Sequence, residues 1–204
     1  MKMVVFGAGG RTGRLVVQQA LEQGHVVTAF LRASHRWDFA HAGLRLVRGD
    51  ASDGEAAAAA IAGQDAVISC LGARRWERVA QLSRSAEHII AGMQRHGVAR
   101  ISYLACAGIY GEIPGLSGIA ARLLQRRVLA DHRRAADALA ASGLDWTIAR
   151  PIRFSGWRLR GDYLEARQGI PSGKSRISRA DTAHFLLRAL KDPLYSHQSI
   201  GLSY

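Results

Sequence analysis

Short apolar runs alternate with longer amphipathic stretches along the chain, and this alternation predicts the order of strands and helices. The apolar runs predict strands at Met1–Phe6, His25–Leu31, Leu44–Arg48, Ala66–Cys70, Arg100–Ala105, Asp145–Ala149 and Gln198–Ser203. The amphipathic stretches predict helices near Thr12–Gln23, Asp53–Ala62, Arg78–His96, Leu123–Ser142 and Arg179–Lys191. Regular alternation indicates an α/β fold, a doubly wound and mainly parallel sheet with helices on both faces.

The length of the chain and its two long irregular stretches complete this outline. A chain of 204 residues fits a single domain, 1–204, with a sizeable core. The irregular stretches lie at about 108–118 and 154–173, and we expect them to be loops that cover a substrate. Ser52 or Asp53 is expected to cap the second helix.

A glycine-rich segment, Gly7-Ala-Gly-Gly-Arg-Thr-Gly13, joins the first strand to the first helix. Gly7 permits a tight turn, Gly10 lets the backbone approach a diphosphate, and Gly13 lets the helix pack close to the strand. Backbone N–H groups and a helix N-terminus then face a phosphate. The segment predicts a Rossmann-type dinucleotide site; the alternative is a glycine-rich turn that binds nothing. The candidate cofactor-binding residues here are Gly7, Gly9, Gly10, Arg11, Thr12 and Gly13.

The end of the second strand indicates which dinucleotide is bound. An NAD site usually has Asp or Glu here for the ribose 2′-hydroxyl, whereas this strand ends at Arg32. Ser34 and Arg36 follow closely, and guanidinium groups hold phosphate oxygens in a bidentate fork. These residues predict NADP(H) as the cofactor. The alternative is chance, because arginine is common throughout the chain.

Small residues follow the other predicted strands, as the close approach of a flat ligand requires. The carboxyl ends of parallel strands meet at one edge of the sheet, so we expect these residues to line the site. Asp50 is expected either to accept a hydrogen bond from an adenine amino group or to be a turn residue or helix cap. The cofactor-binding candidates at these ends are Asp50, Ala51, Leu71, Gly72, Ala73, Arg74, Cys106, Pro151 and Ile152.

The composition narrows the possible partners. The formal net charge is +12, but the arginines are scattered rather than gathered in a basic tail or an aromatic-lined stripe. This argues against a nucleic-acid partner, and part of the charge can attract an anionic cofactor. No apolar run reaches the roughly 20 residues that span a bilayer, so no membrane association is expected. Two cysteines and no room for a signal peptide predict a cytoplasmic protein, and no metal site is predicted.

With these motifs assembled, the chain resembles the atypical short-chain dehydrogenase/reductase family. It is most similar to the branch of biliverdin reductase B-type flavin reductases and NmrA-like proteins. The resemblance extends through Ser142-Gly-Leu-Asp-Trp-Thr-Ile-Ala-Arg-Pro151 and Ser175-Arg-Ile-Ser-Arg-Ala-Asp181. It implies an extended NADP(H) with its nicotinamide near Cys106 and near Pro151-Ile152. It also implies a pocket for large planar acceptors, such as flavins and tetrapyrroles.

The chain departs from its resemblance at the reacting centre. Conventional short-chain dehydrogenases use Tyr-x-x-x-Lys, in which the lysine lowers the pKa of the proton-transferring tyrosine. Here Tyr110 is followed four residues later by Pro114, and Tyr103 by Ala107. Cys106 stands where the resembled branch has a serine, and Ile152 stands where it has a histidine. The catalytic candidates are Cys106, Tyr110 and His132; Trp157 and Tyr163 are expected to form an aromatic floor or to anchor their loop.

Three functions remain open from the sequence. The favoured one is an NADPH-dependent reductase that transfers hydride to a small planar acceptor, which is flavin-, quinone- or biliverdin-like. The second is a non-catalytic, NADP(H)-sensing NmrA-like regulator with a protein partner. The third is a sugar-nucleotide epimerase-like enzyme, and the missing tyrosine–lysine pair argues against it.

Overall fold

The computed structural model describes residues 1–72, 81–113, 115–173 and 176–204. One eight-stranded sheet, in the order β3-β2-β1-β4-β5-β6-β8-β7, contains the strands of this described part. Neighbouring strands are parallel except β7 and β8, which pair antiparallel. The doubly wound, mainly parallel α/β sheet that the sequence predicts is confirmed. The strands are β1 (Lys2–Phe6), β2 (Val26–Leu31), β3 (Leu44–Arg48), β4 (Ala66–Ser69), β5 (Arg100–Leu104), β6 (Asp145–Pro151), β7 (Leu164–Ala166) and β8 (Gln198–Ser203).

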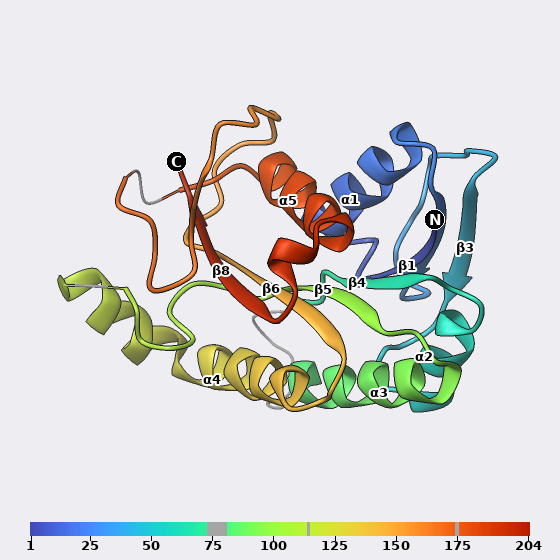
Figure 1. Ribbon diagram of the computed structural model, residues 1–204, viewed down its shortest axis with the longest axis horizontal. Helices are drawn as coiled ribbons and strands as arrows, with labels where there is room; N and C mark the ends of the chain where they lie inside the picture. Colours follow the sequence, from blue (N-terminus) through green and yellow to red (C-terminus); the bar gives the residue numbers. More distant parts are fainter. Residues whose placement is uncertain (73–80, 114, 174–175) are drawn as a thin grey trace.

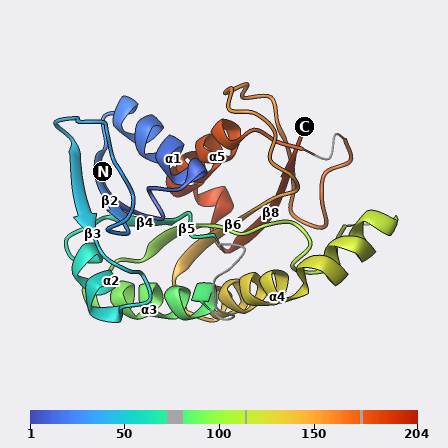
Figure 2. The ribbon, with the colours of Figure 1, turned by 180° about the vertical axis from the view of Figure 1, so that it is seen from behind.

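Helices cover both faces of the sheet, as Figure 1 shows and Figure 2 repeats from behind. α1 (Arg11–Glu22) and α5 (Arg179–Lys191) pack together on one face. α2 (Gly54–Ile61), α3 (Gln81–His96) and α4 (Gly115–Ala140) lie side by side on the other. A short 3₁₀ helix, η1 (Pro193–Tyr195), joins α5 to β8.

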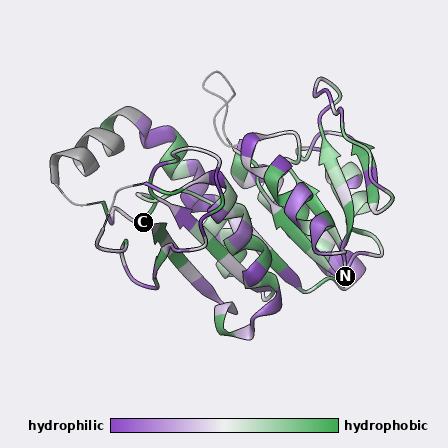
Figure 3. Cartoon of the chain, turned by 90° about the horizontal axis from the view of Figure 1, so that it is seen from above, coloured by the Kyte–Doolittle hydropathy of each residue, from purple (hydrophilic) through white to green (hydrophobic). Residues whose placement is uncertain are grey.

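Each face of the sheet has its own hydrophobic core. Because successive side chains of a strand point to opposite faces, Val5 packs with Val16 of α1 and Phe185 of α5, whereas Val4 packs with Ile61 of α2. These side chains are fully excluded from solvent. In Figure 3 the strands are mainly green, whereas many outer turns of the helices carry purple residues. The pattern of buried strands between amphipathic helices is what fixes the sheet in the middle layer.

Helix caps explain where two of the helices begin. The Asp53 side chain accepts hydrogen bonds from the backbone N–H groups of Glu55 and Ala56, at 3.0 and 3.2 Å. Asp53, rather than Ser52, is therefore the cap of α2. Ser178 caps α5 in the same way through the N–H of Asp181, at 2.9 Å.

The largest differences from the sequence prediction concern α4, β7 and β6. α4 begins at Gly115 rather than at Leu123, so the first irregular stretch is shorter than predicted; Gly115 and Gly118 made this segment look unfavourable for helix. β7 lies inside the stretch predicted as loop 154–173. Its three residues have no alternating pattern of their own, and pairing with β8 makes them a strand. β6 continues to Pro151, and residues 78–80 of the predicted third helix lie outside the described residues.

The strand order reverses between β1 and β4. β1 is paired with β2 on one side and with β4 on the other. From β1 the chain therefore first adds β2 and β3 in one direction, and then returns to add β4 and β5 in the other. In an open parallel sheet, this reversal opens a crevice at the carboxyl ends of the strands. The glycine-rich segment leaves β1 at this crevice, beside Cys70 at the end of β4.

Candidate functional site

A cavity of about 800 Å³ lies at the carboxyl ends of the first five strands. This volume is within the roughly 300–1,000 Å³ typical of small-molecule and cofactor sites. The glycine-rich segment forms one wall, the segments after β2 and β3 form the adenosine side expected for a dinucleotide, and the ends of β4 and β5 form the floor. Residues of α3, α4 and α5 complete the far end.

Contacts with backbone atoms require glycine at two positions of the loop. Gly7 has a φ of +73°, and a Cβ there would lie 2.7 Å from the carbonyl oxygen of Cys70. A Cβ on Gly13 would lie 2.2 Å from the carbonyl oxygen of Gly7. Both distances are too short for a side chain, so the turn can keep this form only with glycine. The loop is therefore built for close backbone approach, which is the arrangement that a diphosphate requires.

The N-terminus of α1 is arranged to receive an anion. Its cap, Gly10, offers no side-chain hydrogen bond, and the first turn contains no acidic residue. The first-turn N–H groups have no partner within the helix, and they carry the positive end of the helix dipole. Arg11 adds a cation at a position where a helix without an anionic ligand favours an acid. A phosphate at this end would satisfy all three features.

Arg32 and Asp50 face each other on the adenosine side of the cavity. The Arg32 Nε lies 3.9 Å from the Asp50 Oδ2. The Asp50 Oδ1 accepts hydrogen bonds from the backbone N–H and the hydroxyl of Ser52, at 2.9 and 2.8 Å. The hydrogen bond from the Ser52 N–H is the main cause that lowers the pKa of Asp50. Of the two roles expected for Asp50, the structure shows the turn role, with Oδ2 directed to Arg32.

The loop after β2 is held by an arginine from β3. Arg48 donates hydrogen bonds to the carbonyl oxygens of Ala33 and His35, at 3.1 and 3.0 Å. His35 lines the cavity, and its ring is so close to the glycine loop that a Cβ on Gly9 would lie 2.5 Å from it. This contact makes the adenosine side compact, and no pattern in the sequence singled out His35.

Cys106 and His132 lie at the far end of the cavity, and both are in their neutral forms at pH 7. Burial raises the pKa of the Cys106 thiol to about 12, and the nearby Glu112 adds to the effect. Burial lowers the pKa of His132 to about 4, although Asp131 opposes the shift. A thiolate nucleophile and an imidazolium acid are therefore both disfavoured here. The two side chains are suited to neutral contacts with a ligand.

Asp131 ties α4 to the start of α3 at this end. Its carboxylate accepts hydrogen bonds from the backbone N–H groups of Leu82 and Ser83, at 2.9 and 3.3 Å, and from the Ser83 hydroxyl at 2.7 Å. Burial alone would raise the pKa of Asp131, but these bonds hold it below its usual value. The clamp fixes the helix turn that carries His132.

The predicted site residues fall into three groups. Those that line the cavity are Gly7, Gly9, Gly10, Arg11, Thr12, Arg32, Asp50, Ala51, Leu71, Gly72, Cys106 and His132. Those placed elsewhere in the described structure are Gly13, Ser34, Arg36, Tyr110, Pro151 and Ile152. Ala73 and Arg74 lie outside the described residues.

The residues away from the cavity have other contacts. Tyr110 is 41% exposed, and the guanidinium groups of Arg133 and Arg150 each lie 5.7 Å from its ring centroid. Pro151 is the last residue of β6, and its carbonyl oxygen accepts a hydrogen bond from the Ala107 N–H at 2.9 Å. Of the two roles expected for Tyr163, part of an aromatic floor or an anchor for its loop, its 2.9 Å hydrogen bond with His184 of α5 fits the anchor.

Several lining residues were missed from the sequence. Gln125 and Val128 of α4 line the cavity beside the predicted His132, and the spacing of three and four residues places all three on one helix face. Because His132 was already a candidate, this spacing could have predicted that Gln125 and Val128 line the same cavity. Phe154 and Arg179 also line the cavity, from the segment after β6 and from the first residue of α5. Only the fold brings these two segments together.

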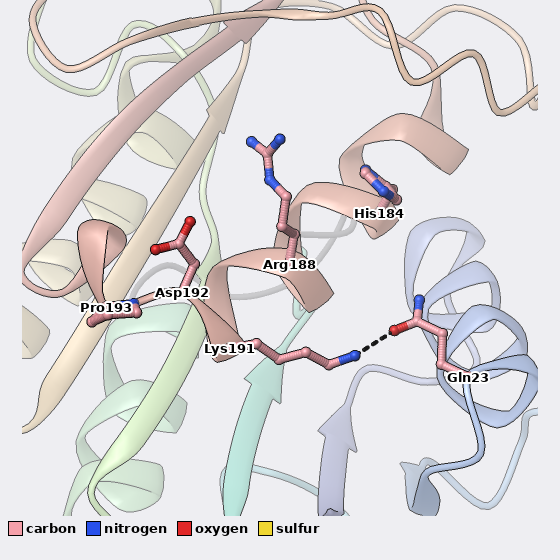
Figure 4. A pocket seen from close by; sticks show the side chains of 6 residues that line it. All are labelled: Gln23, His184, Arg188, Lys191, Asp192 and Pro193. Atoms are coloured by element: carbon pink, nitrogen blue, oxygen red, sulfur yellow. Dashed lines mark hydrogen bonds between the residues drawn. The ribbon is translucent and has the colours of Figure 1, made fainter.

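A second cavity, of about 450 Å³, lies near the C-terminal ends of α1 and α5, away from the glycine-rich segment (Figure 4). The dashed line in Figure 4 is a 2.8 Å hydrogen bond from the Lys191 ammonium to Gln23. Arg188 pairs with Glu165, and His184 is bonded to Tyr163. Because these polar groups have partners within the chain, we regard this cavity as structural.

The profile of a family described as NAD(P)H-binding matches residues 7–193. The chain belongs to this NAD(P)H-binding family. The Rossmann-type relationship and the nicotinamide cofactor predicted from the glycine segment are thereby confirmed.

Individual relatives agree with this assignment. The chain is 33% identical to the 2-alkyl-3-oxoalkanoate reductase of Stenotrophomonas maltophilia (strain K279a) over 108 residues, 50% of this chain. It spans only 32% of the length of that relative. A Rossmann-fold NAD(P)-binding family protein from Shigella flexneri is 26% identical, with a TM-score of 0.78 and coverage of 99% of this chain and 92% of that one. ChuY, an anaerobillin reductase from Escherichia coli O157:H7, is 22% identical, with a TM-score of 0.80 and coverage of 99% and 96%, and shares the fold.

Among the described residues, no helix is both long and apolar enough to cross a membrane. No group of three or more metal-ligating side chains gathers among them either.

Proposed function

We propose that this protein is an NADPH-dependent reductase that transfers hydride to a planar acceptor of the flavin, quinone or bilin class. The observation that carries the proposal is the continuity of the large cavity. It runs from the glycine segment to Cys106, His132 and Phe154, past the ends of five strands. A dinucleotide held by the glycine segment would extend toward these residues. Two of the related proteins, from Stenotrophomonas maltophilia and from Escherichia coli, are named as reductases.

The cofactor preference is part of this proposal. The first-turn N–H groups of α1 and Arg11 would hold the diphosphate. Arg32 would hold the 2′-phosphate, because it lines the cavity at the end of β2, where an NAD site has an acid. The loop that carries Arg32 is braced by Arg48. This arrangement favours NADPH over NADH.

Cys106 and His132 are proposed to orient the acceptor and not to protonate it. When bound, the reduced nicotinamide supplies a hydride, which carries two electrons and one proton to the acceptor. Cys106 keeps its proton at neutral pH, and neutral His132 can donate or accept a hydrogen bond. A second proton comes from solvent. Planar acceptors suit this site, because hydride transfer to them depends mainly on the alignment of two rings.

The test is the oxidation of NADPH by the purified protein with FMN, a quinone and biliverdin as separate acceptors. We expect loss of NADPH absorbance with at least one of them, and slower loss with NADH. The matched control is Gly13→Ala, which disrupts the glycine-rich segment proposed to bind the diphosphate but leaves Cys106 and His132 unchanged. Tight NADPH binding without turnover across the panel would contradict the proposal.

A non-catalytic, NADP(H)-sensing regulator is the second candidate. The observation in its favour is that neither Cys106 nor His132 is ionised at neutral pH, so neither of these two catalytic candidates is poised as an acid or a base. A regulator of this kind should distinguish NADP⁺ from NADPH in affinity, lack turnover and bind a protein partner. Titration with both nucleotides, followed by affinity capture, separates it from the reductase.

A further inference from the structure

Arg179 is a cation in the wall of the large cavity that the proposed function does not yet use. It is the first residue of α5, and it lines the cavity together with Phe154. Its guanidinium carbon lies 4.7 Å from the ring centroid of Phe154 and 4.9 Å from that of Trp157. Two aromatic rings thus support a planar cation that faces the space where a ligand would lie.

The backbone around Arg179 is firmly held. Ile177 bridges to Phe154, with hydrogen bonds of 2.8 Å from Ser155 to Ile177 and from Ile177 to Arg153. The buried carboxylate of Asp181 accepts hydrogen bonds from the N–H groups of Arg160 and Gly161, at 2.9 and 2.8 Å. These bonds join the segment after β6 to the first turn of α5. The backbone position of Arg179 is therefore set by contacts between two segments of the fold.

The charge of Arg179 is not neutralised within the described part of the chain. Other arginines form ion pairs there, for example Arg150 with Glu112 and Arg188 with Glu165, but Arg179 and Arg11 form none. Arg11 is close enough to add to the effect of burial in lowering the pKa of Arg179. Two cations that line one cavity and form no ion pair with the described carboxylates favour an anionic ligand.

Arg179 lies between the predicted diphosphate position and the acceptor side of the cavity, because α5 packs beside α1, which begins at Arg11. Arg32 follows β2, and Arg11 follows β1, so the predicted 2′-phosphate and diphosphate positions lie on the β1–β2 side. Phe154 follows β6, which lies beyond β4 and β5 on the other side of β1. Arg179 is packed against Phe154, at the end of the cavity where the acceptor is proposed to bind.

Resting on the proposed function, we propose that Arg179 binds an oxyanion arm of the acceptor, a carboxylate or a phosphate, and selects acidic planar acceptors over neutral ones. The rings of Phe154 and Trp157 support the guanidinium, whose N–H groups can then form a bidentate pair with the oxyanion. Arg179 is then a specificity-determining residue, with no part in moving hydride or protons.

The test measures binding, so it needs no turnover. FMN and riboflavin share one ring system and differ by a phosphate. Their affinities for the NADP⁺-loaded protein are measured by quenching of flavin fluorescence. We expect the wild type to prefer FMN, and Arg179→Gln to reduce that preference about tenfold, as the loss of a charge-assisted pair predicts. Arg179→Lys, which keeps the charge, should retain part of the preference.

A matched control is Arg160→Gln. The guanidinium of Arg160 is also stacked on an aromatic ring, 4.6 Å from the centroid of Tyr204, but it does not line the cavity. This variant should keep the wild-type preference for FMN. Biliverdin and its dimethyl ester form a second pair of probes, which tests a carboxylate arm in place of a phosphate.

Three results would overturn the inference. The first is a wild type that binds the acidic and neutral members of both pairs equally. The second is an equal loss of FMN and riboflavin affinity in Arg179→Gln, which would make Arg179 a packing residue. The third is a tenfold loss of NADP⁺ affinity in that variant, which would assign the guanidinium to the dinucleotide. Selective binding of acidic probes without NADPH oxidation would support the inference and refute only the reductase.

Discussion

Replacing Arg32 with glutamate tests the proposed NADPH preference most directly. The guanidinium lines the cavity at the end of β2, and its Nε lies 3.9 Å from the Asp50 carboxylate. In Arg32→Glu, a second carboxylate would face Asp50 at the proposed position of the 2′-phosphate. The variant removes an attractive charge and adds a repulsive one without touching the glycine segment or the far end of the cavity.

The size of the effect follows from the exposure of the site. The side chain of Arg32 is 32% exposed, so solvent weakens its interactions compared with those of a buried group. A hydrogen bond to a charged group contributes about 1.5–3 kcal/mol, and repulsion by the new carboxylate adds to its loss. We therefore expect NADPH binding to weaken by about 2 kcal/mol or more, roughly thirtyfold in Kd. Loss of the half-exposed pair with Asp50 should cost less than about 1 kcal/mol of stability.

Calorimetric titration with NADPH and NADH separates this effect from general damage. NADH lacks the 2′-phosphate, so its affinity in Arg32→Glu should change by less than about threefold. Arg36→Glu is the matched control, because it makes the same change of charge at an exposed residue outside the cavity. If Arg32→Glu and Arg36→Glu weakened NADPH equally, or if Arg32→Glu left its Kd unchanged, the assignment of Arg32 would be wrong.

Three further predictions address the cradle, a buried ion pair and pH. Gly13→Ala would place a Cβ 2.2 Å from the Gly7 carbonyl oxygen, so NADP⁺ titration should show more than a roughly tenfold loss of affinity. Glu112→Gln leaves the 3%-exposed Arg150 without its charge partner, and urea unfolding should show about 3 kcal/mol less stability. The native pKa of His132, about 4, lies below its unfolded value, so the unfolded state takes up the proton first as the pH falls. Between pH 6.5 and 4 the wild type should therefore lose about 2–3 kcal/mol more stability than His132→Gln, and equal losses would refute a buried neutral imidazole.

Local patterns were sufficient for most of the fold because each element carries its own signal. The glycine segment follows an apolar strand and opens an amphipathic helix, which fixes the first crossover before any tertiary contact is known. β7 shows the limit of this approach. Leu164–Ala166 becomes a strand only because β8 offers a free edge, and the partner lies more than thirty residues further along the chain. Gly115 and Gly118 misled the prediction of α4, because tertiary context overrides helix propensity.

The residues of the site likewise fall into those that local patterns reveal and those that only the fold brings together. Arg11, Arg32 and Asp50 could be found because each lies within five residues of the end of a strand that the sequence reveals. Phe154 and Arg179 could not, since their approach depends on a bridge between segments more than twenty residues apart. A contact between residues far apart in the chain produces no periodic pattern in a single sequence.

The protonation states of Cys106 and His132 limit the possible reactions more than the residue types do. A cysteine beside a histidine can form a reactive pair, but here burial keeps the Cys106 thiol protonated and the His132 imidazole neutral. Carbonyl reduction requires a proton at the oxygen as the hydride arrives, and neither group is poised to provide it at pH 7. Acceptors that delocalise the incoming electron pair over a ring system can instead take a proton from water afterwards. In the proposed reductase, selection among such acceptors would come from the walls of the cavity, and the guanidinium of Arg179, which forms no ion pair within the described part of the chain, lies beside Phe154 where it can serve that task.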